Sequence, residues 1–169
     1  MGTGSVKGRP RARCYVASPL GFTDAGRLWM GTVLLPALQA RVEPVDPWSL
    51  GPAGEFAEAE AAGEAAYAAL LDEVGRRNAA AIAGCDLLLA VLDGQEVDAG
   101  TAAEVGYAAG LGLPCLGLRT DLRVSGEPGA GVNLQVRWFI RAGGGAVATT
   151  LSELLGLLES PPAGAAPHR

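Results

Sequence analysis

Short apolar runs alternate with longer amphipathic stretches along most of the chain. The strongest run, 86–92, is continuously apolar after its first residue, as expected for a strand covered on both faces. Weaker runs stop at turn residues such as Ser18-Pro19 and Asp46-Pro47. The pattern predicts strands at 13–17, 41–45, 86–92, 114–118 and 146–148.

Residues with helical spacing fill most of the gaps between these strands. In 23–39, for example, apolar residues occur at helical spacing, namely Leu28, Trp29, Val33, Leu34 and Leu38. Helices are predicted over 23–39, 55–83, 99–111 and 151–158, with Gly63 and Gly75 as candidate breaks in the second, and 119–136 is predicted to be a Gly/Pro-rich loop.

Strands that alternate with helices predict a parallel sheet with right-handed crossovers. We therefore expect an α/β protein with a flavodoxin-like, doubly wound sheet of about five parallel strands and helices on both faces. One domain is expected over 12–159, between flexible tails at 1–11 and 160–169. Because ligands of such sheets bind outside the carboxyl ends of the strands, the loops 18–24, 46–54, 93–100 and 119–133 are the candidates for a site.

Composition excludes several classes of function. The chain has 169 residues and a formal net charge of −5, which argues against nucleic acid as a partner. No apolar run approaches the ~20 residues of a membrane span, and no apolar stretch follows the basic N-terminus, so we expect a cytoplasmic protein without a membrane partner. The single histidine, His168, and the single lysine, Lys7, lie near the chain ends. This argues against a catalytic triad, a His-based metal site, a Schiff base and a P-loop, and we expect neither a metal nor a cofactor.

Four carboxylates fall within twelve residues after the third predicted strand: Asp93, Glu96, Asp98 and Glu104. They lie at the carboxyl end of the strand and the beginning of a helix, which Asp98 is expected to open. A structural interpretation competes with a catalytic one, because Thr101-x-x-Glu104 matches a capping box in which the glutamate serves only the helix. This stretch alone leaves both interpretations open.

A second segment favours the catalytic interpretation. Tyr15 lies in the first predicted strand, and the loop Gly21-Phe22-Thr23-Asp24 follows it. Together with Asp98-x-Gly-x-x-x-Glu104-x-Gly-Tyr107-Ala and Val132-Asn133-Leu134, in this order across 13–134, these residues resemble the nucleoside 2-deoxyribosyltransferase family. The resemblance implies a flavodoxin-like fold and cleavage of the N-glycosidic bond of a deoxynucleoside.

The resemblance also implies roles for individual residues. Glu104 is expected to attack C1′ and form a glycosyl-enzyme, as in a retaining glycosidase. Asp98 is expected to handle the proton of the base, and the Tyr15 hydroxyl to orient Glu104. Asn133 matches an asparagine that contacts the sugar, typically of a neighbouring subunit. The remaining substrate-binding candidates are Phe22, Asp24, Trp48, Asn78, Asp93 and Gly100. Tyr15 as an ordinary strand residue and Asn133 as a turn residue are the structural alternatives.

The chain departs from the family pattern at two places. Asn78 stands where some members carry an aspartate, and an amide can hydrogen-bond a base edge but cannot deliver a proton. Proton handling therefore shifts toward Asp98 or Asp93. The C-terminus also lacks the aromatic residue that closes the pocket in some members. Trp48 is a candidate for stacking on the base instead, with core packing as the alternative.

These observations predict a nucleoside 2-deoxyribosyltransferase of nucleotide salvage that acts on deoxynucleosides and free nucleobases. We expect a homo-oligomer with shared active sites, each completed by the 119–134 loop of a neighbour. One alternative is a hydrolase of nucleoside 5′-monophosphates, for which Ser18 and Arg27 are the available phosphate donors. Another is a non-catalytic nucleotide-binding module.

Overall fold

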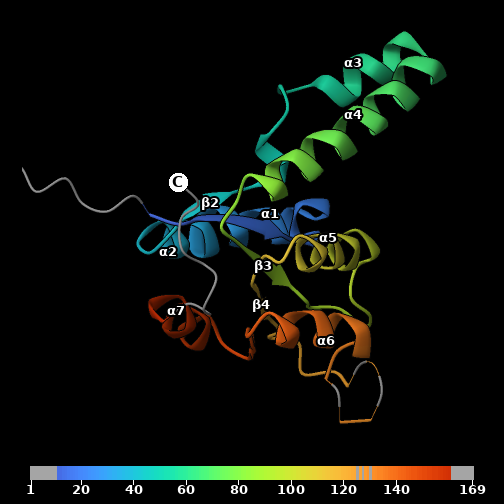
Figure 1. Ribbon diagram of the computed structural model, residues 1–169. Coiled ribbons are helices and arrows are strands. Elements are labelled where there is room, and N and C mark those ends of the chain that lie inside the picture. The colour runs from blue at the N-terminus through green and yellow to red at the C-terminus, as the bar shows by residue number, and fades with distance from the viewer. Residues whose placement is uncertain (1–10, 125, 127, 130, 161–169) are drawn as a thin grey trace, which may run out of the picture.

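The computed structural model describes residues 11–124, 126, 128–129 and 131–160. Five strands form one parallel sheet in the order β2-β1-β3-β4-β5, with helices around it (Figure 1). The strands are β1 (Arg13–Ala17), β2 (Glu43–Val45), β3 (Leu87–Val91), β4 (Cys115–Leu118) and β5 (Val147–Ala148). This order is that of flavodoxin-like sheets, so the predicted fold class is confirmed and every strand falls within its predicted range. The expected tails lie outside the described residues, apart from Arg11 and Ser160.

The two faces of the sheet carry separate cores. Side chains of a strand alternate between faces, so Val16 and Leu89 join one cluster while Tyr15 and Leu88, which pair in register, join the other. The first cluster is covered by α1 (Asp24–Trp29), α2 (Leu35–Gln39) and α7 (Leu151–Glu159). The second is covered by the end of α4 (Glu64–Ala83), by α5 (Ala99–Gly110) and by α6 (Leu134–Ala142).

The helix predicted over 23–39 is divided into three parts. A π-helical turn, Met30–Leu34, separates α1 from α2. Pro36 lies in the first turn of α2, and it has no N–H for the regular helical hydrogen bond. A wider turn before the proline accommodates this defect without ending the helical path. Met30, Leu34 and Leu38 consequently still face the core together.

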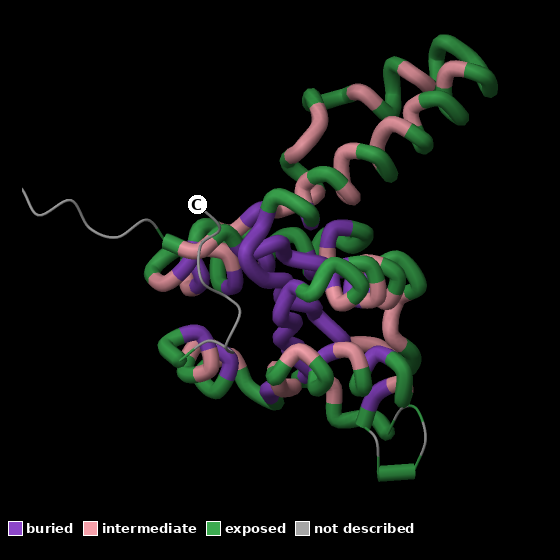
Figure 2. Tube along the Cα trace, in the orientation of Figure 1, coloured by how far each residue is buried: buried purple, intermediate pink, exposed green. Residues whose placement is uncertain are grey.

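The helix predicted over 55–83 is a hairpin of α3 (Glu55–Ala62) and α4. The chain reverses at Gly63, whose φ of 106° is a conformation that glycine adopts without a steric penalty. The second candidate break, Gly75, is wrong, because it lies inside α4. The hairpin projects away from the sheet (Figure 1), and most of its residues are exposed or half-buried (Figure 2).

The loop predicted over 119–136 overlaps the beginning of α6 (Leu134–Ala142), a helix that the sequence pattern does not predict. Asn133 accepts hydrogen bonds from the backbone N–H groups of Gln135 and Val136, so the helix begins at Leu134. Val136 and Ile140, four residues apart, fix the inner face of α6 on the second core cluster. Three glycines and one proline between 126 and 131 are typical of a loop, and they conceal the short helix that follows.

All three cysteines are free and buried. Cys14 lies in β1, Cys115 in β4 and Cys85 just before β3. Burial raises the pKa of the Cys85 thiol to about 11 and that of the Cys115 thiol to about 12, and it raises the pKa of Cys14 still further. The thiols therefore belong to the core.

Candidate active site

A cavity of about 650 Å³ opens at the carboxyl ends of β1, β2 and β3. The sheet order reverses between β1 and β3, which is the point where doubly wound sheets bind ligands. The cavity is lined by the loops after β1 and β2, the beginning of α5 and one side of the α3–α4 hairpin. Of the residues predicted for the site, it brings together Phe22, Trp48, Asn78, Asp98, Gly100 and Glu104.

The centre of the cavity is a carboxylate held by a buried tyrosine. Tyr15 is fully buried in β1, and its hydroxyl donates a hydrogen bond to Glu104 Oε1 with 2.5 Å between the oxygens. Burial and the adjacent carboxylate raise the pKa of the Tyr15 hydroxyl, so it remains a proton donor in this contact. The hydroxyl of Tyr15 therefore contacts the candidate site, beyond the packing expected of an ordinary strand tyrosine.

The surroundings of Glu104 act on the pKa of its carboxyl in opposite directions. Burial raises the pKa of its carboxyl, the hydrogen bond from Tyr15 lowers it, and the negative charge of Asp98 raises it, with a net upward shift. The hydrogen bond stabilises the charged carboxylate that a nucleophile requires, while burial removes water that would compete with a substrate. The arrangement suits a carboxylate that attacks an electrophilic carbon.

Asp98 caps α5, as expected, and the alternative capping box at Thr101 and Glu104 does not form. Asp98 Oδ2 accepts hydrogen bonds from the Thr101 backbone N–H at 2.9 Å and from the Thr101 hydroxyl at 3.2 Å. The helix therefore begins three residues earlier than the capping box requires, and Glu104 lies in its second turn. Because Glu104 has no capping role, its carboxylate is available to the cavity.

Two aromatic side chains form one wall. Phe22 and Trp48 pack edge to face with 4.7 Å between ring centroids, and Trp48 Nε1 donates a hydrogen bond to the Ser18 carbonyl. Both rings remain substantially exposed. Gly21 lies against the indole, and a Cβ there would meet the ring at 2.0 Å. Core packing of Trp48 is therefore excluded, and its position permits contact with a planar base.

The opposite wall comes from the α3–α4 hairpin and contains residues that the sequence did not single out. Arg77 and Glu55 form an ion pair at 2.7 Å, and both side chains are largely buried. Asn78 also lines the cavity, and its side-chain amide has no hydrogen-bond partner among the described residues. A signal existed, because Tyr67, Leu71, Val74 and Asn78 recur at helical spacing on one side of α4.

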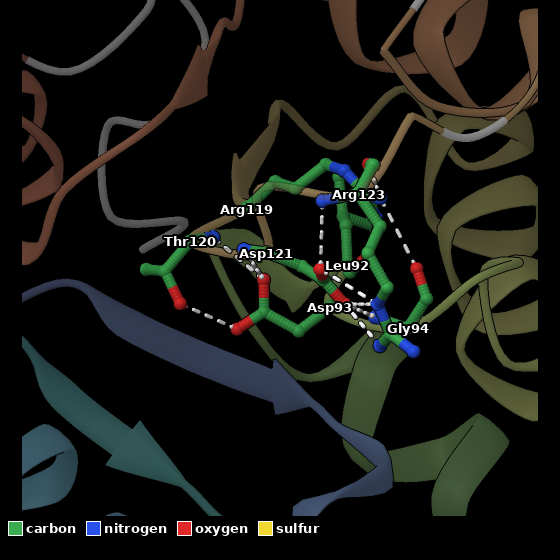
Figure 3. A network of polar contacts seen from close by, with 7 residues as sticks. All are labelled: Leu92, Asp93, Gly94, Arg119, Thr120, Asp121 and Arg123. Atoms are coloured by element: carbon green, nitrogen blue, oxygen red, sulfur yellow. Dashed lines mark hydrogen bonds and ion pairs between the residues drawn. The ribbon is translucent and has the colours of Figure 1, made fainter.

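Four predicted site residues lie outside the cavity lining: Tyr15, which is linked to the cavity through Glu104, and three residues that lie elsewhere. Asp93 belongs to a network that joins the loops after β3 and β4 (Figure 3), where its carboxylate accepts hydrogen bonds from the Thr120 N–H and hydroxyl and from the Asp121 N–H. Asp24 pairs with Arg27 at the surface. Asn133 is the N-cap of α6.

Within the described part of the chain, no three His, Cys, Asp or Glu side chains gather as a metal site. None of the described helices combines the length and the apolar composition needed to cross a bilayer.

Comparison with protein families matches residues 14–140 to nucleoside 2-deoxyribosyltransferase. The chain belongs to this family. The matched region contains Tyr15, Asp98, Glu104 and Asn133, and thus the whole predicted constellation of the nucleoside 2-deoxyribosyltransferase family. Comparison with curated proteins gives no match.

Solved structures similar to this member of the family share its fold at low sequence identity. A conserved protein from Enterococcus faecalis has a TM-score of 0.64 and 24% identity, covering 89% of this chain and 98% of its own. A 2-deoxyribosyltransferase from Leishmania mexicana has a TM-score of 0.62 and 23% identity, covering 88% and 97%. A CMP N-glycosidase from Clostridium botulinum has a TM-score of 0.53 and 16% identity, covering 87% and 98%.

Proposed function

We propose that the protein exchanges the base of 2′-deoxynucleosides in nucleotide salvage, through a covalent glycosyl intermediate on Glu104. The observation that carries the proposal is the hydrogen bond of 2.5 Å from the buried Tyr15 hydroxyl to the Glu104 carboxylate, in a cavity where the sheet order reverses. Family membership supports the same chemistry.

The reaction has two displacement steps. Glu104 attacks C1′ of the deoxyribose, the bond between C1′ and the base nitrogen breaks, and the base leaves with the bonding electron pair. The leaving base takes a proton from Asp98, which enters this step in its protonated form and leaves it as a carboxylate. A second base then attacks C1′, releases Glu104 as a carboxylate and returns a proton to Asp98. Two inversions at C1′ retain the configuration of the nucleoside, so the product is a nucleoside with the same sugar.

The charges around the cavity favour a neutral nucleoside over a nucleoside 5′-monophosphate. Glu55, Asp98 and Glu104 are its carboxylates, and Arg77 is the one cation among the described lining residues, already paired with Glu55. Arg27, a candidate phosphate donor, binds the Gly21 carbonyl and Asp24 instead. A phosphate dianion would face net negative charge here, which opposes its binding.

The test follows product formation with two donor nucleosides. Deoxyinosine or thymidine is incubated with free adenine, and deoxyadenosine and free deoxyribose are both measured, with Glu104→Gln as the inactive control. New deoxyadenosine supports the transferase. Free deoxyribose alone indicates a hydrolase, and ribose 5-phosphate released from CMP in a parallel reaction indicates the monophosphate hydrolase. No product from any donor refutes the proposed function.

We also propose that each site is completed by the Asn133 segment of a neighbouring subunit. The support is that Asn133 lies outside the cavity lining of its own chain while its motif matches the family. Asn133→Ser retains a capping oxygen for α6, so it separates a sugar contact from the cap. We expect Asn133→Ser and Glu104→Gln subunits to be inactive alone and partly active when mixed. No recovery between subunits that demonstrably exchange contradicts a shared site.

A further inference from the structure

We propose that Arg77 and Glu55 are positioning residues that join the two walls of the candidate active site. Their contacts set the width of the base slot, the space between the Trp48 indole and the Asn78 amide. The expected kinetic effects rest on the proposed function, whereas the attachment of the two walls is a property of the fold and is measured without substrate.

The α3–α4 hairpin has few points of attachment to the rest of the chain. α4 is 20 residues long, yet Ile82 near its C-terminal end is its only buried residue, and α3 has none. The hairpin projects beyond the sheet (Figure 1), and it is exposed or half-buried along most of its length (Figure 2). A segment with few buried apolar contacts opens locally at a small cost in free energy. The hairpin wall of the cavity therefore needs contacts of another kind to keep its place.

Arg77, which lines the cavity, supplies such contacts. Its Nη2 lies 2.7 Å from Glu55 Oε2 in the first turn of α3, and its Nη1 donates a hydrogen bond of 3.4 Å to the carbonyl of Leu50. The side chains of Arg77 and Glu55 are only 18% and 16% exposed, so water screens this ion pair much less than it screens a surface pair. The contacts of Arg77 with Glu55 and Leu50 form a junction between the hairpin and the loop after β2.

The junction connects the two walls of the base slot. Leu50 directly follows the short 3₁₀ helix η3 (Pro47–Ser49), which carries the Trp48 indole of the aromatic wall. Asn78, next to Arg77 in α4, lines the opposite wall. One guanidinium thus ties the backbone beside the indole to the helix that carries the amide. Because both groups lie within two residues of the junction, its contacts control the distance between them.

Gly51 leaves room for the junction. A Cβ at position 51 would meet Glu55 Oε1 at 2.0 Å and Arg77 Nη1 at 2.3 Å. Both atoms lie at the ends of flexible side chains, so an added methyl group displaces the two charged groups rather than the backbone. Gly51→Ala therefore loosens the junction and keeps both charges, whereas Arg77→Met removes the guanidinium itself.

The kinetic test follows the transfer of deoxyribose from deoxyinosine to adenine in these two junction variants, each with a matched control in α4. Arg76→Met removes the neighbouring arginine, whose side chain is 69% exposed and pairs with Glu73. Gly75→Ala adds a Cβ that meets nothing within 4 Å. Both controls should leave KM and kcat unchanged.

We expect KM for adenine to rise about 10-fold in both junction variants, because the displaced amide of Asn78 no longer reaches the base and a neutral hydrogen bond is worth up to about that factor. At saturating adenine, kcat should change less than about 2-fold, since Tyr15 and Glu104 lie on β1 and α5 and not on the hairpin. Arg77→Lys keeps the charge but not the two-armed guanidinium, so it should recover part of the affinity for adenine.

Hydrogen exchange of backbone amides tests the attachment without substrate. In Arg77→Met and Gly51→Ala, the amides of α3 and α4 should exchange about 10-fold faster than in the wild-type protein, while those of β1 and β3 keep their rates. Unchanged exchange in the hairpin overturns the attachment, whether or not the wild-type protein is active.

The kinetic results have their own contrary outcomes. Faster exchange together with an unchanged KM overturns the effect of the junction on the base slot, and so does an equal rise of KM in the Arg76→Met or Gly75→Ala control. A wild-type protein that transfers no base refutes the proposed function and the kinetic effects that rest on it, and the exchange rates alone then decide whether Arg77 joins the two walls.

Discussion

Replacing Tyr15 by phenylalanine removes one hydroxyl from the centre of the candidate site and leaves the ring in the core. The ring is fully buried against the second core cluster, so we expect the fold to be retained. What is lost is the hydrogen bond of 2.5 Å to Glu104. A hydrogen bond to a charged group contributes about 1.5–3 kcal/mol. With a factor of ten in rate for each 1.36 kcal/mol, kcat should fall about 13- to 160-fold. KM should change little, because the hydroxyl contacts the nucleophile and not the substrate.

The same substitution should also change the pH dependence. The hydrogen bond from Tyr15 lowers the pKa of Glu104 against the effect of burial, so its removal raises that pKa. A smaller fraction of Glu104 is then the reactive carboxylate at a given pH. The acidic limb of the kcat/KM profile should therefore move to higher pH. Tyr107→Phe, at an exposed tyrosine on the same helix as Glu104, is the matched control. Unchanged kcat together with an unmoved acidic limb would refute the positioning role of Tyr15.

Substitutions at three further positions, Glu104, Asp98 and Gly21, separate chemistry from structure. Glu104→Gln should abolish transfer yet stabilise the fold at neutral pH, because a carboxyl whose pKa is raised by folding destabilises the native state above its unfolded pKa. In chemical denaturation, the gain in free energy of unfolding should vanish as the pH falls below that unfolded pKa. A gain that is constant with pH contradicts the raised pKa of Glu104. Asp98→Asn should keep the cap of α5 and lose activity, whereas Asp98→Ala should lose activity and about 1 kcal/mol of stability, so equal stability of the two variants argues against the cap. Gly21→Ala should displace Trp48 and raise KM more than it lowers kcat. The control Gly31→Ala, whose added Cβ meets nothing within 4 Å, should leave KM and kcat unchanged. Equal effects of the two variants on KM and kcat would contradict a contact between Trp48 and the base.

The sheet could be predicted from sequence because its central strands are distinct apolar runs. Residues 87–91 are buried on both faces and show no alternation, which is the signal of a central parallel strand. Helix α6 could not be predicted in the same way. It has only two buried residues, Val136 and Ile140, and its inner face is defined by the core it contacts rather than by a long periodic stretch.

The candidate site was predictable where a residue lies in a strand, caps the helix that follows a strand, or lies in the first two turns of that helix. Tyr15, Asp98 and Glu104 are of this kind, since the carboxyl ends of neighbouring parallel strands meet at one edge of the sheet. The contact between Arg77 and Glu55 is different, because it depends on the chain reversal at Gly63. The capping box at Thr101 was an open alternative because threonine is also a good N-cap, whereas the structure shows that the expected residue, Asp98, caps α5.

The buried thiols allow opening of the sheet to be measured by alkylation. A thiol reacts with an alkylating agent only when it is accessible and deprotonated. In the closed fold, burial makes the thiols of Cys14 and Cys115 inaccessible and raises their pKa. These two cysteines lie in β1 and β4, on either side of β3, so labelling of either requires the sheet itself to open. The alkylation rates of Cys14 and Cys115 should therefore agree with each other and vary with the free energy of global unfolding. Fluctuations confined to the α3–α4 hairpin should not change these rates.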